Sequence, residues 1–236
     1  MSFLVAYQPV QATHQTTQCK WDFPWPRQVG IYLFNNLYDN IQPLQFSWWE
    51  MERAVYGPAT WSEANFNLYF RTSYSDQNVG WSTTNGQSRF SFMARADLPF
   101  PDSTAIAVTY IFDTAGNRVA PSNPCSRDAG TPVLYAYTYF NSSYGFYFDC
   151  RAYQQYCQDN HPYDFRNTAA HETGHWFVMN HSGDQSLFGC AGHGCDDTKF
   201  AKSSIGEWSK RDLTADDRNA GWTMYGCRNG GANYWC

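Results

Sequence analysis

Charged residues are scarce in this sequence, and long apolar runs are absent from it. Asp, Glu, Lys and Arg make up only 16% of the 236 residues, and the net charge is −5. The basic residues form no stripe, which argues against nucleic acid as the main partner. No apolar run approaches the length of a membrane span, so we expect no membrane partner either.

CxxC pairs are also absent, although the chain contains eight cysteines. Cysteines at other spacings suit disulfides better than a redox or zinc cluster, which indicates an oxidising compartment. Because eight cysteines allow about 105 connectivities, the pairing stays open. The first residues lack a secretory signal pattern, so we expect the mature form of a secreted protein. Three pairs are close enough in sequence to close small loops: Cys150 with Cys157, Cys190 with Cys195, and Cys227 with Cys236.

The most informative stretch that is present is HETGHWFVMNH, from His171 to His181. On a helix, predicted for residues 167–178, His171 and His175 lie one turn apart on the same face. Two imidazoles so placed can reach one tetrahedral zinc ion at about 2.0–2.1 Å. His181 follows six residues later and can supply a third nitrogen if the chain turns back. Three protein ligands leave the fourth position to water, as in a catalytic site. We therefore predict one catalytic zinc ion and leave a structural calcium ion unassigned.

Glu172 lies directly beside the first of these histidines. Its carboxylate can reach a metal-bound water without being a ligand, so we predict that it acts as a general base and then as a general acid. The HExxH spacing also arises by chance in helices with ordinary surface histidines. The third histidine at a suitable distance favours the zinc site over that interpretation.

Five stretches ahead of this helix have the composition of strands, and two further helices are expected around them. One helix is predicted for Gln45–Val55, and the other runs from an N-cap at Thr214 to about Tyr225. We interpret residues 1–27 as an extended N-terminal arm and 28–236 as a single domain. Its upper lobe covers about 28–180 and its lower lobe about 181–236. The predicted strands are Val29–Phe34, Phe66–Arg71, Arg89–Ala94, Ala105–Phe112 and Val133–Phe140.

These motifs resemble those of the metzincin zinc peptidases, and most closely the matrixin-like branch. The core motif of that family, HExxHxxGxxH, is matched by His171, Glu172, His175 and His181. The resemblance implies an α/β (α+β) fold, with a twisted mixed five-stranded sheet packed on helices, a zinc helix at the cleft and a loop-rich C-terminal subdomain. Three further stretches are similar to the family's first helix and following strand, its last strand before the zinc helix, and its closing helix: Glu52–Phe70, Tyr135–Asn141 and Leu213–Gly226.

The resemblance also implies an activity, namely hydrolysis of peptide bonds by a secreted, monomeric zinc endopeptidase. Its partner is a protein or peptide substrate, which in this family pairs with an edge strand of the sheet. The sequence of that strand fits a plain core strand equally well, so both interpretations stay open here. The residues expected to bind the substrate are Ala105, Ile106, Ala107, Val108, Thr109 and Tyr110.

Two positions depart from the family pattern. Val178 stands where the family has a glycine, and a β-branched residue at positive φ is strained by about 1–3 kcal/mol. The family's methionine turn below the metal has no methionine between His181 and the closing helix. We expect that turn near 201–204 without its methionine, with Met224 as the alternative. Neither departure removes a predicted zinc ligand.

Two other functions compete with this interpretation. In a gluzincin-type peptidase the third ligand would be Glu207, although its surroundings show little helical periodicity. In a secreted zinc-containing binding module, the aromatic content of 19% would serve recognition and no cleavage would occur. The presence of Glu172 favours catalysis, because a module that only binds has no use for it.

Overall fold

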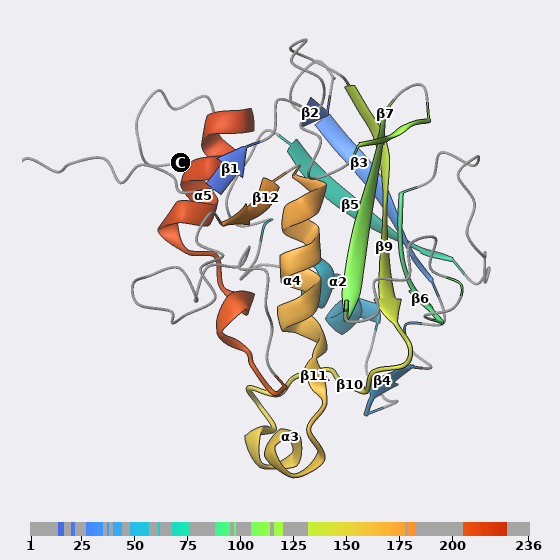
Figure 1. The fold of residues 1–236 in the computed structure, drawn as a ribbon, viewed down its shortest axis with the longest axis vertical. Coiled ribbons are helices and arrows are strands. Elements are labelled where there is room, and N and C mark those ends of the chain that lie inside the picture. The colour runs from blue at the N-terminus through green and yellow to red at the C-terminus, as the bar shows by residue number, and fades with distance from the viewer. Residues whose placement is uncertain are drawn as a thin grey trace, which may run out of the picture.

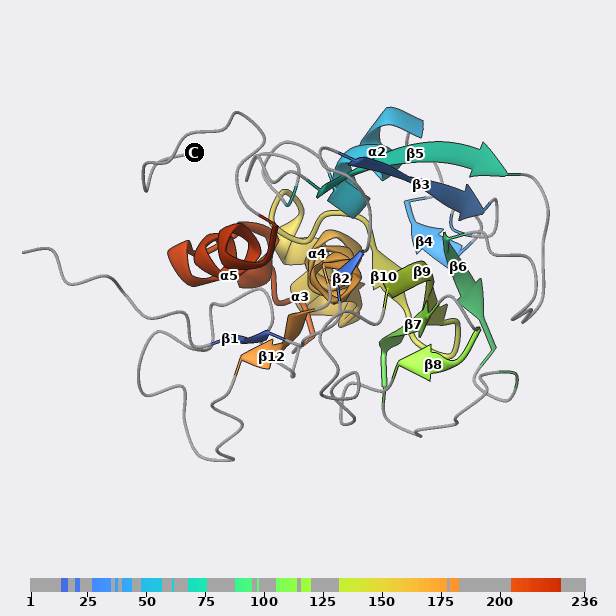
Figure 2. The ribbon, with the colours of Figure 1, turned by 90° about the horizontal axis from the view of Figure 1, so that it is seen from above.

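A mixed sheet, with helices packed on one of its faces, makes up most of the described part of the chain (Figure 1). The fold is therefore a mixed α/β fold. In Figure 2, α4 lies between the sheet and α5. The computed structural model describes residues 14–16, 20–21, 27–34, 37, 40–43, 48–56, 61, 68–75, 88–94, 97, 105–113, 116–119, 132–177, 179–182 and 205–225.

The large sheet has seven strands among the described residues, in the order β5-β3-β6-β9-β7-β8, with β2 paired to β9. Strands β5, β3, β6, β9 and β2 are mutually parallel where they pair, whereas β7 is antiparallel to β9 and to β8. The strands are β2 (Lys20–Trp21), β3 (Arg27–Phe34), β5 (Leu68–Ser75), β6 (Arg89–Met93), β7 (Ala107–Asp113), β8 (Arg118–Val119) and β9 (Pro132–Asn141).

Each of the five predicted strands overlaps one of the long strands β3, β5, β6, β7 and β9. The expected number of five is wrong, however, because β2 and β8 join the same sheet. Each of these two strands has two residues, too few for an alternating pattern to be visible in the sequence. Strand β2 also comes from the stretch predicted as an extended arm, and it pairs with the start of β9 at Pro132 and Val133.

Alternating side chains of β7 and β9 fill two separate cores, as the period of two in a strand requires. On the face covered by helices lie Ala107, Ile111, Ala136 and Phe140. On the opposite face an aromatic cluster gathers around Tyr137. We name this second group the tyrosine cluster; its buried members are Met93, Tyr110, Phe112, Tyr135, Tyr137 and Tyr139.

Helices α2, α4 and α5 overlap the three predicted helices, whereas α3 was not predicted. Thr214 caps α5 as expected, since its Oγ1 accepts the Asp217 backbone N–H at 3.2 Å. Helix α3 was not expected; it is short and is joined to the preceding loop by a disulfide between Cys150 and Cys157, one of the three predicted pairs. No described helix is long and apolar enough to span a membrane. The helices are α2 (Trp48–Tyr56), α3 (Gln154–Asn160), α4 (Phe165–Trp176), the 3₁₀ helix η3 (Ser209–Arg211) and α5 (Ala215–Tyr225).

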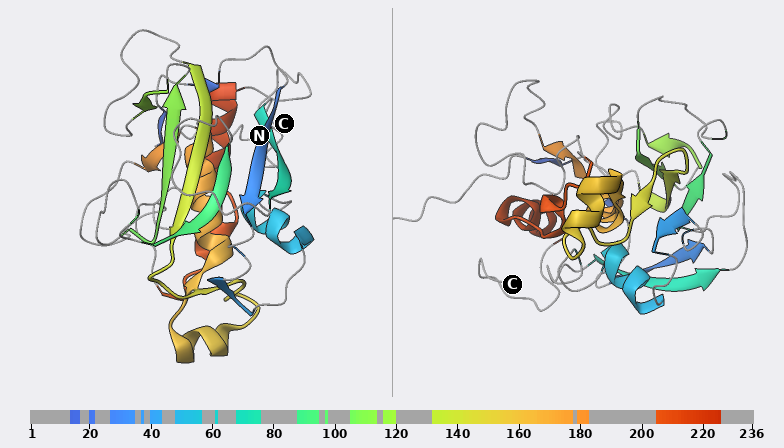
Figure 3. Two further views of the ribbon diagram at one scale, coloured as in Figure 1. Left: turned by 90° about the vertical axis from the view of Figure 1, so that its right-hand side faces the viewer. Right: turned by 90° about the horizontal axis from the view of Figure 1, so that it is seen from below.

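Two small sheets lie at opposite ends of α4 (Figure 1). The three-stranded sheet is parallel and has the order β11-β10-β4, and α3 lies beyond it (Figure 3). The two-stranded sheet pairs β1 with β12 in antiparallel fashion, directly after α4 ends. The strands are β1 (His14–Thr16), β4 (Ile41–Gln42), β10 (Phe146–Tyr147), β11 (Tyr163–Asp164) and β12 (Met179–Ser182).

The tyrosine cluster encloses the side chain of Arg89, which is fully buried. The Arg89 guanidinium carbon lies 4.1 Å from the ring centroid of Tyr137 and 5.8 Å from that of Tyr139, within reach of cation–π attraction. Burial raises the pKa of Tyr137 and of Tyr139 to about 12, although the positive charge of Arg89 acts in the opposite direction.

These raised pKa values predict a loss of stability in alkali. The unfolded chain releases the tyrosine protons near pH 10, whereas the folded chain holds them until about pH 12. The stabilisation is therefore complete below pH 10 and declines as the pH rises through 12, by up to about 1.4 kcal/mol per pH unit for each tyrosine. Urea unfolding between pH 9 and 12 measures this slope. A Tyr139→Phe variant should have a smaller slope, and Tyr153→Phe, at an exposed position, should keep the wild-type slope. An unchanged slope in Tyr139→Phe would contradict the assignment.

Candidate active site

Helix α4 begins at Phe165 because Asp164 caps it. The Asp164 backbone is extended, and its Oδ1 accepts the Asn167 backbone N–H at 2.7 Å, which satisfies one of the unpaired donors of the first turn. The helix thus starts two residues earlier than predicted. The same carboxylate accepts the Cys150 backbone N–H at 2.6 Å and the guanidinium of Arg211 from η3.

The capping carboxylate belongs to a cluster of ion pairs that joins three segments of the chain. Arg211 also reaches Asp149 at 2.7 Å, and Asp149 accepts Arg166 of α4 at 2.9 Å. Burial alone would raise the pKa of the Asp149 carboxyl, but the Ala152 backbone N–H, Arg211 and Arg166 together hold that pKa below its usual value. This cluster fixes the N-terminal end of α4 to the loop after β10 and to η3.

Aromatic side chains fix the rotation of α4 about its axis. Trp61 donates its indole N–H to the Ala170 carbonyl at 2.7 Å, and Trp176 stacks on Phe90 of β6 with ring centroids 4.9 Å apart. At the end of the helix, Tyr225 of α5 donates its hydroxyl to the Phe177 carbonyl at 3.0 Å. The face of α4 that is left partly exposed carries His171 and His175. The sequence contains no local signal for these contacts, because Trp61 and Tyr225 are 109 and 48 residues away from their partners.

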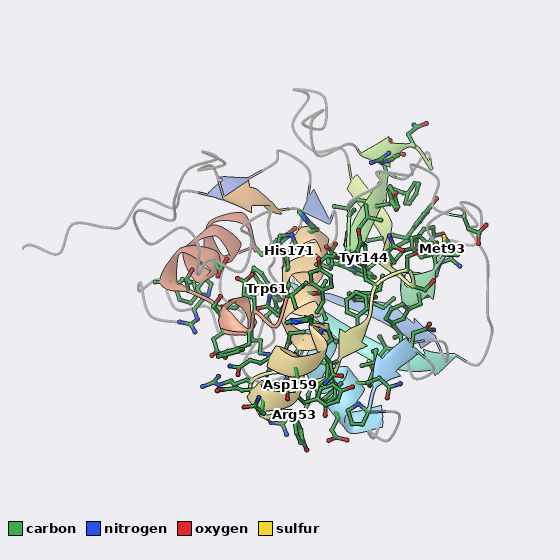
Figure 4. All side chains as sticks on the ribbon, turned by 60° about the horizontal axis from the view of Figure 1, so that its bottom comes forward. Arg53, Trp61, Met93, Tyr144, Asp159 and His171 are labelled. Atoms are coloured by element: carbon green, nitrogen blue, oxygen red, sulfur yellow. A yellow bond between two sulfur atoms is a disulfide. The ribbon has the colours of Figure 1, made fainter. Side chains whose placement is uncertain are left out.

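The two histidines stand next to each other on this face, and Figure 4 shows where His171 lies on α4. Their ring centroids are 5.0 Å apart and their planes are nearly perpendicular, at 82°. Two imidazole nitrogens about 2.0–2.1 Å from one tetrahedral zinc ion place their ring centres roughly 5 Å apart. The donor type, the partial exposure and the spacing of this pair therefore fit a zinc ion.

His181 is the predicted third ligand, and the structure places its backbone in β12. Strand β12 begins three residues after α4 ends and lies beside the C-terminal end of that helix (Figure 1). The side chain of His181 and all of Val178 lie outside the described residues, and so does the turn expected near 201–204. Within the described part of the chain, no group of three His, Cys, Asp or Glu side chains is arranged around one point. The zinc site therefore stays a prediction.

Glu172 occupies the buried side of α4, with 4% of its surface exposed. Its Oε2 accepts the hydroxyl of Thr109 at 2.6 Å. The Thr109 and Thr138 hydroxyls are also 2.6 Å apart, and Thr138 accepts the Trp176 indole N–H at 2.7 Å. The carboxylate predicted as the base is thus held against the sheet by a specific hydrogen bond, a feature that the sequence did not indicate.

The predicted substrate strand corresponds to β7 and the two residues before it. Ala105 and Ile106 precede the strand, and their carbonyls accept the side-chain and backbone N–H groups of Asn141. Residues 105–108 are partly exposed, whereas Thr109 and Tyr110 are buried. Along the edge of β7 that faces away from β9, the described residues contain one partner, β8, which pairs with Ile111 and Phe112. Among the described residues, no strand pairs on this edge with Ala107, Val108 or Thr109. The side chains of Ala107, Val108 and Tyr110 pack in the two cores.

Two further sequence assignments concern Glu207 and Met224. Glu207 accepts a hydrogen bond from Ser209 at 3.0 Å, and the neighbouring Gly206 donates to the Pro162 carbonyl, ahead of the start of α4. It forms no group of potential ligands with His171 and His175 among the described residues. Met224 lies in the last turn of α5, and its side chain lies outside the described residues, so its assignment to the methionine turn stays a prediction.

The chain matches no protein-family model, and it matches no curated protein sequence. The similarity to metzincins accordingly stays a prediction from the motifs quoted above.

Proposed function

We propose that this protein is a secreted zinc-dependent endopeptidase, in which His171, His175 and His181 hold the metal and Glu172 is the general base and acid. The observation that carries the proposal is that the two histidines and Glu172 lie on different sides of α4. The two histidine rings share a partly exposed face at the spacing that one zinc ion requires. Glu172, next to His171 in sequence, lies on a different side of the helix and is held there by Thr109.

His171, His175 and His181 would hold the zinc ion, which when bound would lower the pKa of its water to about 7 and polarise the scissile carbonyl. Proton transfer and substrate orientation are carried out by residues of the chain. Glu172 takes the proton from the attacking water and delivers it to the leaving amine, which is the task of a positioned carboxylate. The edge of β7 at Ala107–Thr109 adds the substrate as a further strand, so that backbone hydrogen bonds orient the scissile bond.

The proposal is tested by digestion of an unfolded protein. The purified chain, loaded with zinc, should cleave casein into fragments. A chelator should stop the cleavage, and added zinc should restore it, because the activated water is lost and regained with the metal. Fragment formation is followed by electrophoresis and mass spectrometry. A folded, zinc-loaded protein that leaves casein and a broad peptide library intact would overturn the proposal and favour a binding module.

A further inference from the structure

Four side chains, that of the candidate base Glu172 included, form one continuous series of hydrogen bonds. The sequence of contacts runs from the Trp176 indole to the Thr138 hydroxyl at 2.7 Å, on to the Thr109 hydroxyl at 2.6 Å, and finally to Glu172 Oε2 at 2.6 Å. All four residues are at least nine-tenths buried. We name this group the Thr–Thr relay; its members are Trp176, Thr138, Thr109 and Glu172.

An indole N–H can only donate, so Thr138 accepts from Trp176. Either threonine can be the donor in the bond between Thr109 and Thr138. An ionised Glu172 can only accept, so Thr109 then donates its one proton to Glu172 and accepts from Thr138. With Glu172 as a carboxylate, every donor of the relay therefore has an acceptor, and the arrangement is compatible with the ionised form that a general base needs.

Both ends of the relay lie on one helix face, and both middle members lie on neighbouring strands. Glu172 and Trp176 are one turn apart on α4, where side chains are about 5–6 Å from each other. Thr109 of β7 and Thr138 of β9 are direct cross-strand partners, with about 4.5–5.5 Å between their Cβ atoms. These two spacings match, so the relay fastens α4 to the sheet at two points; Figure 1 shows α4 beside β7 and β9.

We propose that Thr109, supported by Thr138 and Trp176, is a positioning residue that sets the orientation of the Glu172 carboxylate for catalysis. This inference rests on the peptidase activity proposed above. A carboxylate on a flexible side chain samples many rotamers, and one charge-assisted hydrogen bond from a buried hydroxyl selects among them. The relay thereby presents the base in one orientation before any substrate binds.

The test compares threonine variants in the zinc-loaded protein. Thr109→Val keeps the side-chain shape and removes the hydroxyl, and it should lower kcat about 10- to 100-fold with KM and zinc content unchanged. Thr109→Ser restores a hydroxyl and should return kcat to within about threefold of wild type. The matched control is Thr168→Val. Thr168 is a buried threonine of α4, and its hydroxyl donates to the Asp164 carbonyl at 3.0 Å, away from the relay. Its kcat should stay within about twofold of wild type.

A double-mutant cycle in the metal-free protein separates this inference from the peptidase proposal. The Thr109→Val and Glu172→Ala substitutions should be non-additive in urea unfolding, with a coupling of about fivefold or more in the unfolding equilibrium constant, because each removes the hydrogen bond between the two side chains. Coupling in an inert wild-type protein would refute the peptidase but retain the relay. An active wild type whose kcat is unaffected by Thr109→Val would overturn the positioning role, as would equal losses in Thr109→Val and Thr109→Ser.

Discussion

Replacing Glu172 by Gln is expected to slow peptide cleavage by about 10²–10⁴-fold while zinc content and fold are preserved. The amide cannot take a proton from water, but its carbonyl oxygen can still accept the Thr109 hydroxyl. Gln is therefore a sharper probe than Ala. Glu172→Ala would leave the buried Thr109 hydroxyl without that acceptor, at a cost of about 1–3 kcal/mol in stability. Single-turnover kinetics on a fluorogenic peptide measure the loss of rate.

Glu207→Gln is the matched control for this substitution. It removes the other carboxylate considered for the site, at a partly exposed position near the start of η3. Its kcat and its zinc content should equal those of wild type. If Glu172→Gln were as active as wild type, another group would be the base. If Glu207→Gln lost zinc, the gluzincin-type ligand set would replace the one proposed.

Replacing His175 by Ala is expected to abolish both zinc retention and cleavage. The wild type should hold about one zinc ion per chain after dialysis against metal-free buffer. The variant has at most two of the three imidazoles, and two protein ligands hold zinc poorly. Atomic emission spectroscopy measures the metal content, and circular dichroism verifies that the helix content is retained. His181→Ala tests the third ligand in the same way.

His161→Asn is the control for a histidine outside the site. His161 is exposed and follows α3 with φ of 54°, a left-handed conformation that Asn tolerates well. This variant should keep its zinc and its activity. A His175→Ala protein that still held stoichiometric zinc would rule out the proposed site. Loss of zinc from His175→Ala but not from His181→Ala would keep the helix pair and require another third ligand.

The long strands and the helices α2, α4 and α5 were predictable because each shows its own local pattern. Runs rich in β-branched and aromatic residues mark β7 and β9, and the Thr214 hydroxyl followed by acidic residues marks the start of α5. Helix α3, with seven residues, and the two-residue strands were missed because each spans at most about two periods of its element, too few to show a clear pattern. Their existence depends on partners elsewhere in the chain, such as Cys150 for α3 and Pro132 for β2.

Part of the candidate site was likewise predictable from local sequence spacing, and the rest was decided by packing. The spacing of four residues between His171 and His175 was enough to place both rings on one side of a helix, since helical geometry depends on sequence distance alone. That this side is partly exposed, and that Glu172 turns toward the sheet, was decided by the tertiary structure. Trp61 comes from 109 residues before its partner on α4 and Thr109 from 63 residues before Glu172, and both hold the helix in its rotation. Contacts over such distances leave no periodic trace in the sequence, so only the folded chain reveals the hydrogen bond between Thr109 and Glu172.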